Sequence, residues 1–191
     1  MILAGIDYSY TSPAICIYDT DDKLEFENLK FFNYHVPKKK TFLEGEYGKT
    51  KNIFIVAGPQ WTTQEERFRN IANWATAIIS GHLVEGVVLE GYAMGSKGGM
   101  VFDIAENTAL LKQYLDEWKI PFFKHAPTLV KKEFTGKGNS KKDVMIQTFI
   151  DKLGINLKDI LGTKKDDDKP IDDLVDAFAN LTTHPHFKET E

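Results

Sequence analysis

The chain alternates between short apolar runs and longer stretches in which apolar residues recur at helical spacing. Apolar runs bounded by turn residues predict strands at residues 2–7 and 14–18, and a loosely alternating run predicts a third strand at 24–34. Apolar spacings of three and four predict helices at residues 62–80, 101–118, 141–153 and 171–182. Between the helices, shorter apolar runs predict two more strands at residues 87–90 and 120–124.

This order of elements predicts an α/β protein. Its five-stranded mixed sheet, a three-stranded meander plus two further strands, is flanked by helices. At 191 residues the chain is long enough for one well-packed domain, which we expect to span residues 1–191. Residues 35–60 contain prolines, glycines and a run of three lysines, which predict a long excursion with room for a short strand at 53–57. Residues 162–170 form a charged linker that we expect to be mobile.

Composition restricts the class of protein without indicating a function. Hydrophobic residues make up 42% and charged residues 27%, the balance of an ordinary soluble globular protein. No apolar run is long enough to span a bilayer, and Met1 leads into a strand without a signal pattern, so we expect a cytoplasmic protein. Cys16 is the only cysteine, which excludes an intramolecular disulfide and a cysteine metal cluster. The net charge of −4 argues against uniform nucleic-acid binding, although it does not exclude local basic patches.

Four acidic residues are the candidate catalytic chemistry. Asp7 and Glu90 each end an apolar strand, and adjacent strands lie about 4.8 Å apart. Asp173 and Asp176 are three residues apart on a predicted helix, which places them on one face. If the strands pair and the helix crosses them, these carboxylates converge; Asp172 is the alternative ligand if the helix is rotated by one residue. Oxygen-only ligands favour Mg²⁺ or Mn²⁺, and two such ions about 3.5–4 Å apart support phosphodiester hydrolysis.

A basic segment at residues 124–142 is the candidate DNA-binding surface. It surrounds a Gly-rich turn at 135–140, and its lysines include Lys131, Lys132, Lys137, Lys141 and Lys142. Their density favours contacts with phosphate groups, although an ordinary solvated face is the simpler alternative. Tyr92 and Met94 follow Glu90 in a Gly-rich loop, where they could separate stacked bases at a branch point. Packing of these two side chains into the core is an equally good interpretation.

Four segments combine these features in a fixed order along the chain. They are Gly5-Ile6-Asp7, the strand Val87-Val88-Leu89-Glu90, Lys131 with Thr135-Gly136-Lys137-Gly138-Asn139 and Lys142, and Asp173-Leu174-Val175-Asp176-Ala177-Phe178-Ala179. Together they resemble the RuvC-type Holliday-junction resolvases of the ribonuclease H-like superfamily. The resemblance covers most of the chain. It implies a ribonuclease H-like fold and a metal-dependent endonuclease that cuts branched DNA such as four-way junctions.

The same resemblance implies roles for individual residues. Asp7, Glu90, Asp173 and Asp176 would be the catalytic acids and would hold two Mg²⁺ or Mn²⁺ ions, with no small-molecule cofactor. Lys131 and Lys142 fall where the family carries DNA-contacting lysines. RuvC-type resolvases pair largely through the helix after the Glu strand, so we expect a homodimer formed through residues 101–118.

The chain also departs from the RuvC pattern and leaves alternatives open. Tyr8 and Ser9 stand where the family usually has a glycine, and the excursion is larger than in bacterial enzymes. The compact size and extra loop suggest a virus-encoded relative. The alternatives are a ribonuclease H-like nuclease acting on RNA or other DNA structures, and a nucleic-acid-binding module without catalysis. A proofreading exonuclease is disfavoured because Ser9 stands where a second acid is needed, and a sugar kinase fold needs two such domains.

Overall fold

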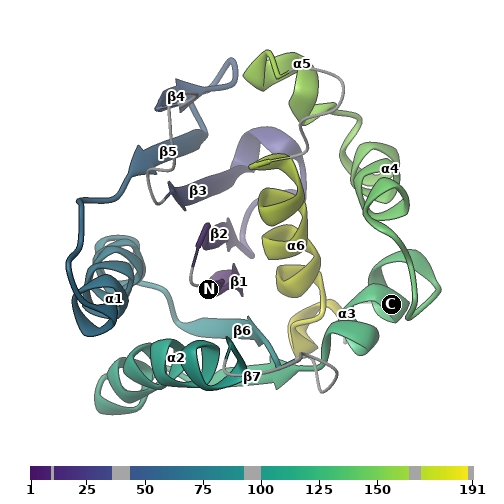
Figure 1. Cartoon of the computed structure of the whole chain (residues 1–191). Helices are drawn as coiled ribbons and strands as arrows, with labels where there is room; N and C mark the ends of the chain where they lie inside the picture. The colour runs from purple at the N-terminus through teal and green to yellow at the C-terminus, as the bar shows by residue number, and fades with distance from the viewer. Residues whose placement is uncertain (10, 36–43, 93–99, 164–168, 189–191) are drawn as a thin grey trace.

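The protein is described by a computed structural model covering residues 1–9, 11–35, 44–92, 100–163 and 169–188. Seven strands form one sheet in the order β4-β5-β3-β2-β1-β6-β7, with helices on both of its faces (Figure 1). The strands are β1 (Ile2–Asp7), β2 (Ala14–Asp19), β3 (Leu29–His35), β4 (Gly45–Tyr47), β5 (Ile53–Ala57), β6 (Gly86–Glu90) and β7 (Phe122–His125).

The sheet confirms the predicted α/β class and the three-stranded meander. Strands β1, β2 and β3 pair antiparallel in sequence order, and β6 then lies parallel to β1 on its other side. The predicted number of five strands is wrong, because the excursion adds β5 beside β3 and the short β4 at the edge. A three-residue edge strand with two exposed positions has too little apolar periodicity to be predicted from sequence. The remainder of the excursion, at 36–43, lies outside the described residues.

The helices divide between the two faces of the sheet (Figure 1). They are α1 (Gln64–Gly81), α2 (Met100–Glu117), α3 (Pro127–Thr135), α4 (Lys142–Leu153), α5 (Leu157–Leu161) and α6 (Ile171–Thr182), with short 3₁₀ turns η1 (Phe26–Asn28) and η2 (Pro185–Lys188). Helices α1 and α2 cover one face, whereas α6 lies on the other between the sheet and the outer helices α3, α4 and α5. Within the described residues, no helix combines the length and apolar character needed to cross a membrane.

Helix α3 was not predicted, and it lies in the middle of the basic segment. Its first residue is Pro127, and it ends at Gly136, whose φ of 85° places it in the left-handed region that favours glycine. Only Val130 and Phe134, one helical turn apart, are buried in the core. The many lysines around these two positions conceal the apolar periodicity that would have indicated a helix.

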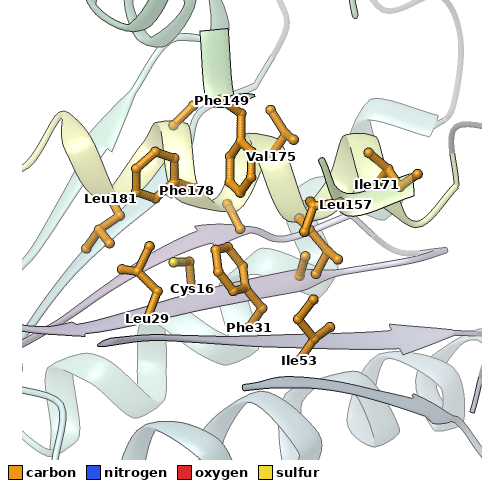
Figure 2. Close-up of a cluster of buried hydrophobic side chains, with 14 of the residues drawn as sticks. Cys16, Leu29, Phe31, Ile53, Phe149, Leu157, Ile171, Val175, Phe178 and Leu181 are labelled. Atoms are coloured by element: carbon orange, nitrogen blue, oxygen red, sulfur yellow. The ribbon is translucent and has the colours of Figure 1, made fainter. Parts of the chain in front are cut away.

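Two hydrophobic cores lie on opposite faces of the sheet. Figure 2 shows the core beneath α6, where side chains from the central strands meet those of α6 and the outer helices. Phe149 and Phe178 pack edge to face with their ring centroids 5.3 Å apart, and Phe31 meets Phe149 at 6.0 Å. The second core packs β1, β2 and β6 against α1 and α2. Because the first core fixes α6 against the central strands, groups carried at the ends of these elements are held firmly.

Gly5 is the point at which α6 contacts the sheet most closely. A Cβ atom at this position would lie 2.2 Å from the backbone nitrogen of Leu181 and 2.3 Å from the carbonyl oxygen of Ala177. Both neighbours are helix backbone, so they cannot move aside as a flexible side chain could. The helix therefore rests directly on the backbone of β1, two residues before Asp7.

We expect Gly5→Ala to lower the free energy of unfolding by about 1–3 kcal/mol or more, because the added methyl group overpacks this contact. Urea denaturation measures the change. Gly81→Ala is the matched control: its Cβ would meet no atom within 4 Å, so it should leave stability nearly unchanged. Equal stability of Gly5→Ala and the wild type would contradict the close approach of α6 to β1.

Candidate functional site

A row of polar residues crosses the sheet beneath α6. In the strand registers, Asn33 on β3 pairs with Ala14 on β2, and Ala14 pairs with Asp7 on β1. Glu90 on β6 pairs with His125 on β7. The β1–β6 ladder ends at the pair Ile6–Leu89, so Asp7 and Glu90 are the next residue on each strand. Alternation along β1 places Asp7 on the same face as Gly5, where α6 lies. The strand ends therefore present two carboxylates side by side toward the helix.

Helix α6 brings the remaining acids to this row. Burial raises the pKa of Asp7 well above the usual aspartate range, and three nearby carboxylates, those of Glu90, Asp173 and Asp176, raise the same pKa further. Asp173 is only 3% exposed and Asp7 8%, so little water reaches either group. The structure thus brings together all four acids that the sequence singled out.

The other acids of this cluster also have raised pKa values. Burial is the main cause for Asp176, whose pKa rises to about 7, and Glu90 is the carboxylate that contributes most to it. Burial likewise raises the pKa of Asp173 to about 6, although the adjacent Lys169 ammonium acts in the opposite direction. Burial raises the pKa of Glu90, which the positive charge of Lys131 partly offsets. Such a cluster favours any cation that can reach it.

Two lysines supply positive charge to the acidic cluster. The Lys169 ammonium pairs with Oδ1 of Asp173 and lies 3.4 Å from Oδ2 of Asp172. Lys142 pairs with the same Asp172 oxygen. Asp172, the alternative ligand in the sequence, thus contacts both lysines and Asp173 contacts one, and the α6 acids whose charges raise the pKa of Asp7 are Asp173 and Asp176.

The chemistry of the cluster fits a hard divalent cation. Its donors are carboxylate oxygens, the ligands that Mg²⁺ and Mn²⁺ prefer. Burial is the main cause of the raised pKa values of Asp7 and Asp176, and repulsion from neighbouring carboxylates raises both further, which a bound cation would relieve. In the part of the chain that the structure describes, no three His, Cys, Asp or Glu side chains stand in positions that would hold one ion. The acids share one electrostatic environment without forming a closed cage.

A cleft of about 180 Å³ opens beside the cluster. Asp7 and Glu90 line it together with Tyr92 and residues from the start of α2 and α3. Tyr92 is half-buried, and the Lys124 ammonium lies 4.7 Å from the centre of its ring. This aromatic side chain therefore forms part of the wall beside the acids; Met94, the other residue predicted for this loop, lies outside the described residues.

The predicted DNA-binding lysines fall into two groups. Lys132, Lys137 and Lys141 are exposed on α3, on the Gly-rich turn and at the start of α4. Hydrogen bonds from Thr135 and Ser140 hold that turn, including a 2.6 Å contact between their hydroxyl groups. Lys131 and Lys142 instead face the acids: Lys131 lowers the pKa of Glu90 and of Asp176, and Lys142 pairs with Asp172.

Three residues of the site were not predicted from the sequence. Ser12 donates a 2.7 Å hydrogen bond to Asp173, and Asn33 donates one of 3.2 Å to Ser12. The only signal for Asn33 is an amide between the aromatic residues Phe32 and Tyr34 of the strand. Lys169 belongs to the stretch that was predicted as a mobile linker, and residues 164–168 of that stretch lie outside the described residues.

Comparisons with known proteins identify the fold. The sequence gives no significant match to models of protein families or to curated proteins. The structure is similar to that of Thermus thermophilus RuvC in complex with a Holliday junction substrate, with a TM-score of 0.64, 16% identity, and coverage of 100% of this chain and 96% of that one. The structure is also similar to that of the yeast mitochondrial Holliday junction resolvase, with a TM-score of 0.55, 15% identity, and coverage of 94% of this chain and 75% of that one.

The fowlpox virus Holliday junction resolvase gives a TM-score of 0.50 and 18% identity, with complete coverage of both chains. These three similarities extend over nearly the whole chain, although each sequence is less than 20% identical to this one. They confirm the predicted ribonuclease H-like fold and its likeness to the RuvC-type resolvases.

The raised pKa values predict how pH changes the stability of the metal-free protein. A carboxyl whose pKa rises from 3.8 to about 7, as for Asp176, binds protons more tightly when folded, so stability falls as pH rises through that window. In EDTA, the free energy of unfolding should be at least about 1 kcal/mol higher at pH 5 than at pH 8. Urea titrations at both pH values measure the difference.

Asp176→Asn should reduce this difference. This variant separates the contribution of Asp176 from those of other titrating groups. His125 is one such group: its pKa is lowered chiefly by burial, so its contribution makes stability rise with pH. A variant with the same pH dependence as the wild type would contradict the proposed repulsion within the cluster.

Proposed function

We propose that this protein is a metal-dependent endonuclease that cuts branched DNA, such as four-way junctions, by phosphodiester hydrolysis. The observation that carries the proposal is the gathering of Asp7, Glu90, Asp173 and Asp176 beside an open cleft. Clustered carboxylates destabilise a fold that has no use for them, so their convergence favours a role in binding cations. The likeness to solved Holliday junction resolvases makes a branched duplex the first substrate to test.

In this proposal the four acids hold two Mg²⁺ or Mn²⁺ ions. When bound, such ions polarise the scissile phosphate and generate the attacking hydroxide. The chain itself would provide the oxygen ligands and the rigid support of β1 and α6, and a phosphate in the cleft would lie beside Asp7 and Glu90, which line it. Lys131, whose charge acts on both Glu90 and Asp176, is positioned to meet a phosphate at the edge of the cluster.

The exposed lysines form the surface on which the flanking DNA would lie. Lys132, Lys137 and Lys141 lie on consecutive elements around the Gly-rich turn, which leads from α3 into the N-terminus of α4. Phosphate contacts at such positions contribute affinity that does not depend on sequence and weakens with salt. Tyr92 beside Lys124 offers an aromatic surface at the cleft, suited to contact with a base near the branch point.

Cleavage assays with single acid variants test the proposed chemistry. Asp7→Asn, Glu90→Gln and Asp176→Asn should each slow cleavage of a synthetic four-way junction more than about 100-fold, because loss of a direct ligand costs more than loss of an outer partner. Binding of the junction should persist. Asp151→Asn, which changes an exposed acid on α4, is the control and should cut normally.

The same assay should include a linear duplex, an RNA–DNA hybrid and an EDTA lane. Selective cutting of the hybrid would favour the ribonuclease alternative. Near-normal cutting by two of the three acid variants, or full activity in EDTA, would contradict the four-acid metal site.

We also propose that the protein acts as a homodimer paired through α2. Phe102 on α2 is 72% exposed and Trp118, the residue after its end, is 62% exposed, whereas Leu111 and Leu115 of α2 are fully buried in the core. The helix therefore has one apolar side against the sheet and a further apolar residue exposed on its surface, with Trp118 exposed just beyond its end. A four-way junction has approximate two-fold symmetry, which a two-fold dimer with one site per chain would match.

Phe102→Glu combined with Trp118→Glu should convert a dimer at micromolar concentration to a monomer in sedimentation experiments, because charges at both positions oppose burial. On a cruciform plasmid, the wild type should give linear product directly, whereas the variant should accumulate nicked circles. Leu83→Asn, at an exposed leucine outside α2, is the matched control. A wild type that sediments as a monomer both alone and on junction DNA would overturn the dimer.

A further inference from the structure

The two carboxylate oxygens of Asp173 have different partners, a neutral hydroxyl group and a positively charged ammonium group. One carboxylate oxygen, Oδ2, accepts a 2.7 Å hydrogen bond from the hydroxyl of Ser12, which lies in the connection between β1 and β2. The other, Oδ1, contacts the Lys169 ammonium. The two oxygens are therefore not equivalent: one is bound inside the protein and the other faces a positive charge.

The hydrogen bond to Asp173 is the end of a chain that begins in the sheet. A serine hydroxyl has one hydrogen, and Ser12 uses it for the carboxylate, so the same oxygen must accept the 3.2 Å hydrogen bond from Nδ2 of Asn33. Asn33 donates its second Nδ2 hydrogen to the carbonyl oxygen of Pro13, also at 3.2 Å. Because every donor is assigned, the relay has one direction, from Asn33 through Ser12 to Asp173.

The relay lies within the protein rather than at its surface. Asn33 is 0% exposed, Ser12 5% and Asp173 3%. Along the same face of β3, the two preceding inward positions are Leu29 and Phe31, both in the hydrophobic core. An apolar residue at position 33 would continue that core, and an amide there is costly to bury unless its hydrogen bonds serve a purpose.

We propose that Ser12 and Asn33 are positioning residues that orient Asp173 as a metal ligand. They fix Oδ2 and leave Oδ1 for the cation. The Lys169 ammonium, itself a positive charge, contacts this Oδ1. This inference rests on the proposed function, because it assigns Asp173 to the metal site. Partners of this kind typically change metal affinity 10–100-fold, an order-of-magnitude effect.

Calorimetric titration of the DNA-free protein with Mn²⁺ alone tests the relay. Ser12→Ala should raise the Kd for Mn²⁺ about 10–100-fold. Asn33→Leu should raise it less, because Ser12 keeps its own hydrogen for Asp173. In the Ser12→Ala background, Asn33→Leu should have little further effect, because the two residues act in series; two independent structural defects would add instead.

Asn52→Leu is the matched control. Asn52 is also buried, at 4% exposure, and its Nδ2 also donates two hydrogen bonds, to the carbonyl oxygens of Phe26 and Leu29, away from the acids. It should lower stability in urea without changing the Kd for Mn²⁺. The relay is overturned if Ser12→Ala has the same Kd for Mn²⁺ as the wild type, or if Asn52→Leu raises the Kd as much as Ser12→Ala does. Either result leaves the proposed function unaffected. A wild type that neither binds Mn²⁺ nor cuts the junction overturns both.

Discussion

The contact between α6 and the backbone of β1 at Gly5 is the constraint on which the site depends. With no side chain at Gly5, the helix lies within reach of the strand backbone, and its acids come over the end of β1. The helix is fixed there by the core around Phe178 and by the outer helices (Figure 2). A larger residue at this position would lift the acids of α6 away from Asp7, so one glycine links the packing of the protein to its chemistry.

Once the helix is placed, electrostatics determine what the site can do. Burial raises the pKa values of Asp7 and Asp173, nearby carboxylates raise that of Asp7 further, and ion pairs with Lys169 and Lys142 compensate part of the negative charge on α6. Burial and mutual repulsion are unfavourable for folding, but they create a strong local preference for cations. A DNA phosphate approaching the cleft would meet the same group from outside, near Lys131.

The parts of this arrangement that follow from local pattern could be predicted from the sequence. Asp7 and Glu90 end apolar strands, and Asp173 and Asp176 share a helix face, so the candidate acids are visible without a structure. The parts that arise from tertiary contacts could not. Ser12 and Asp173 are 161 residues apart and meet only because β1 and α6 pack together. Helix α3 was concealed because only two of its nine residues pack into the core, within a segment rich in lysines, and Lys169 resembled a residue of a solvated linker.

The central claim is that these acids form a divalent-metal site, and the most direct measurement is anomalous diffraction from crystals soaked in Mn²⁺. The structure predicts anomalous density beside Asp7, Glu90, Asp173 and Asp176, with the Lys169 ammonium moved away from Asp173. Strong density elsewhere and none among these four carboxylates would contradict the claim.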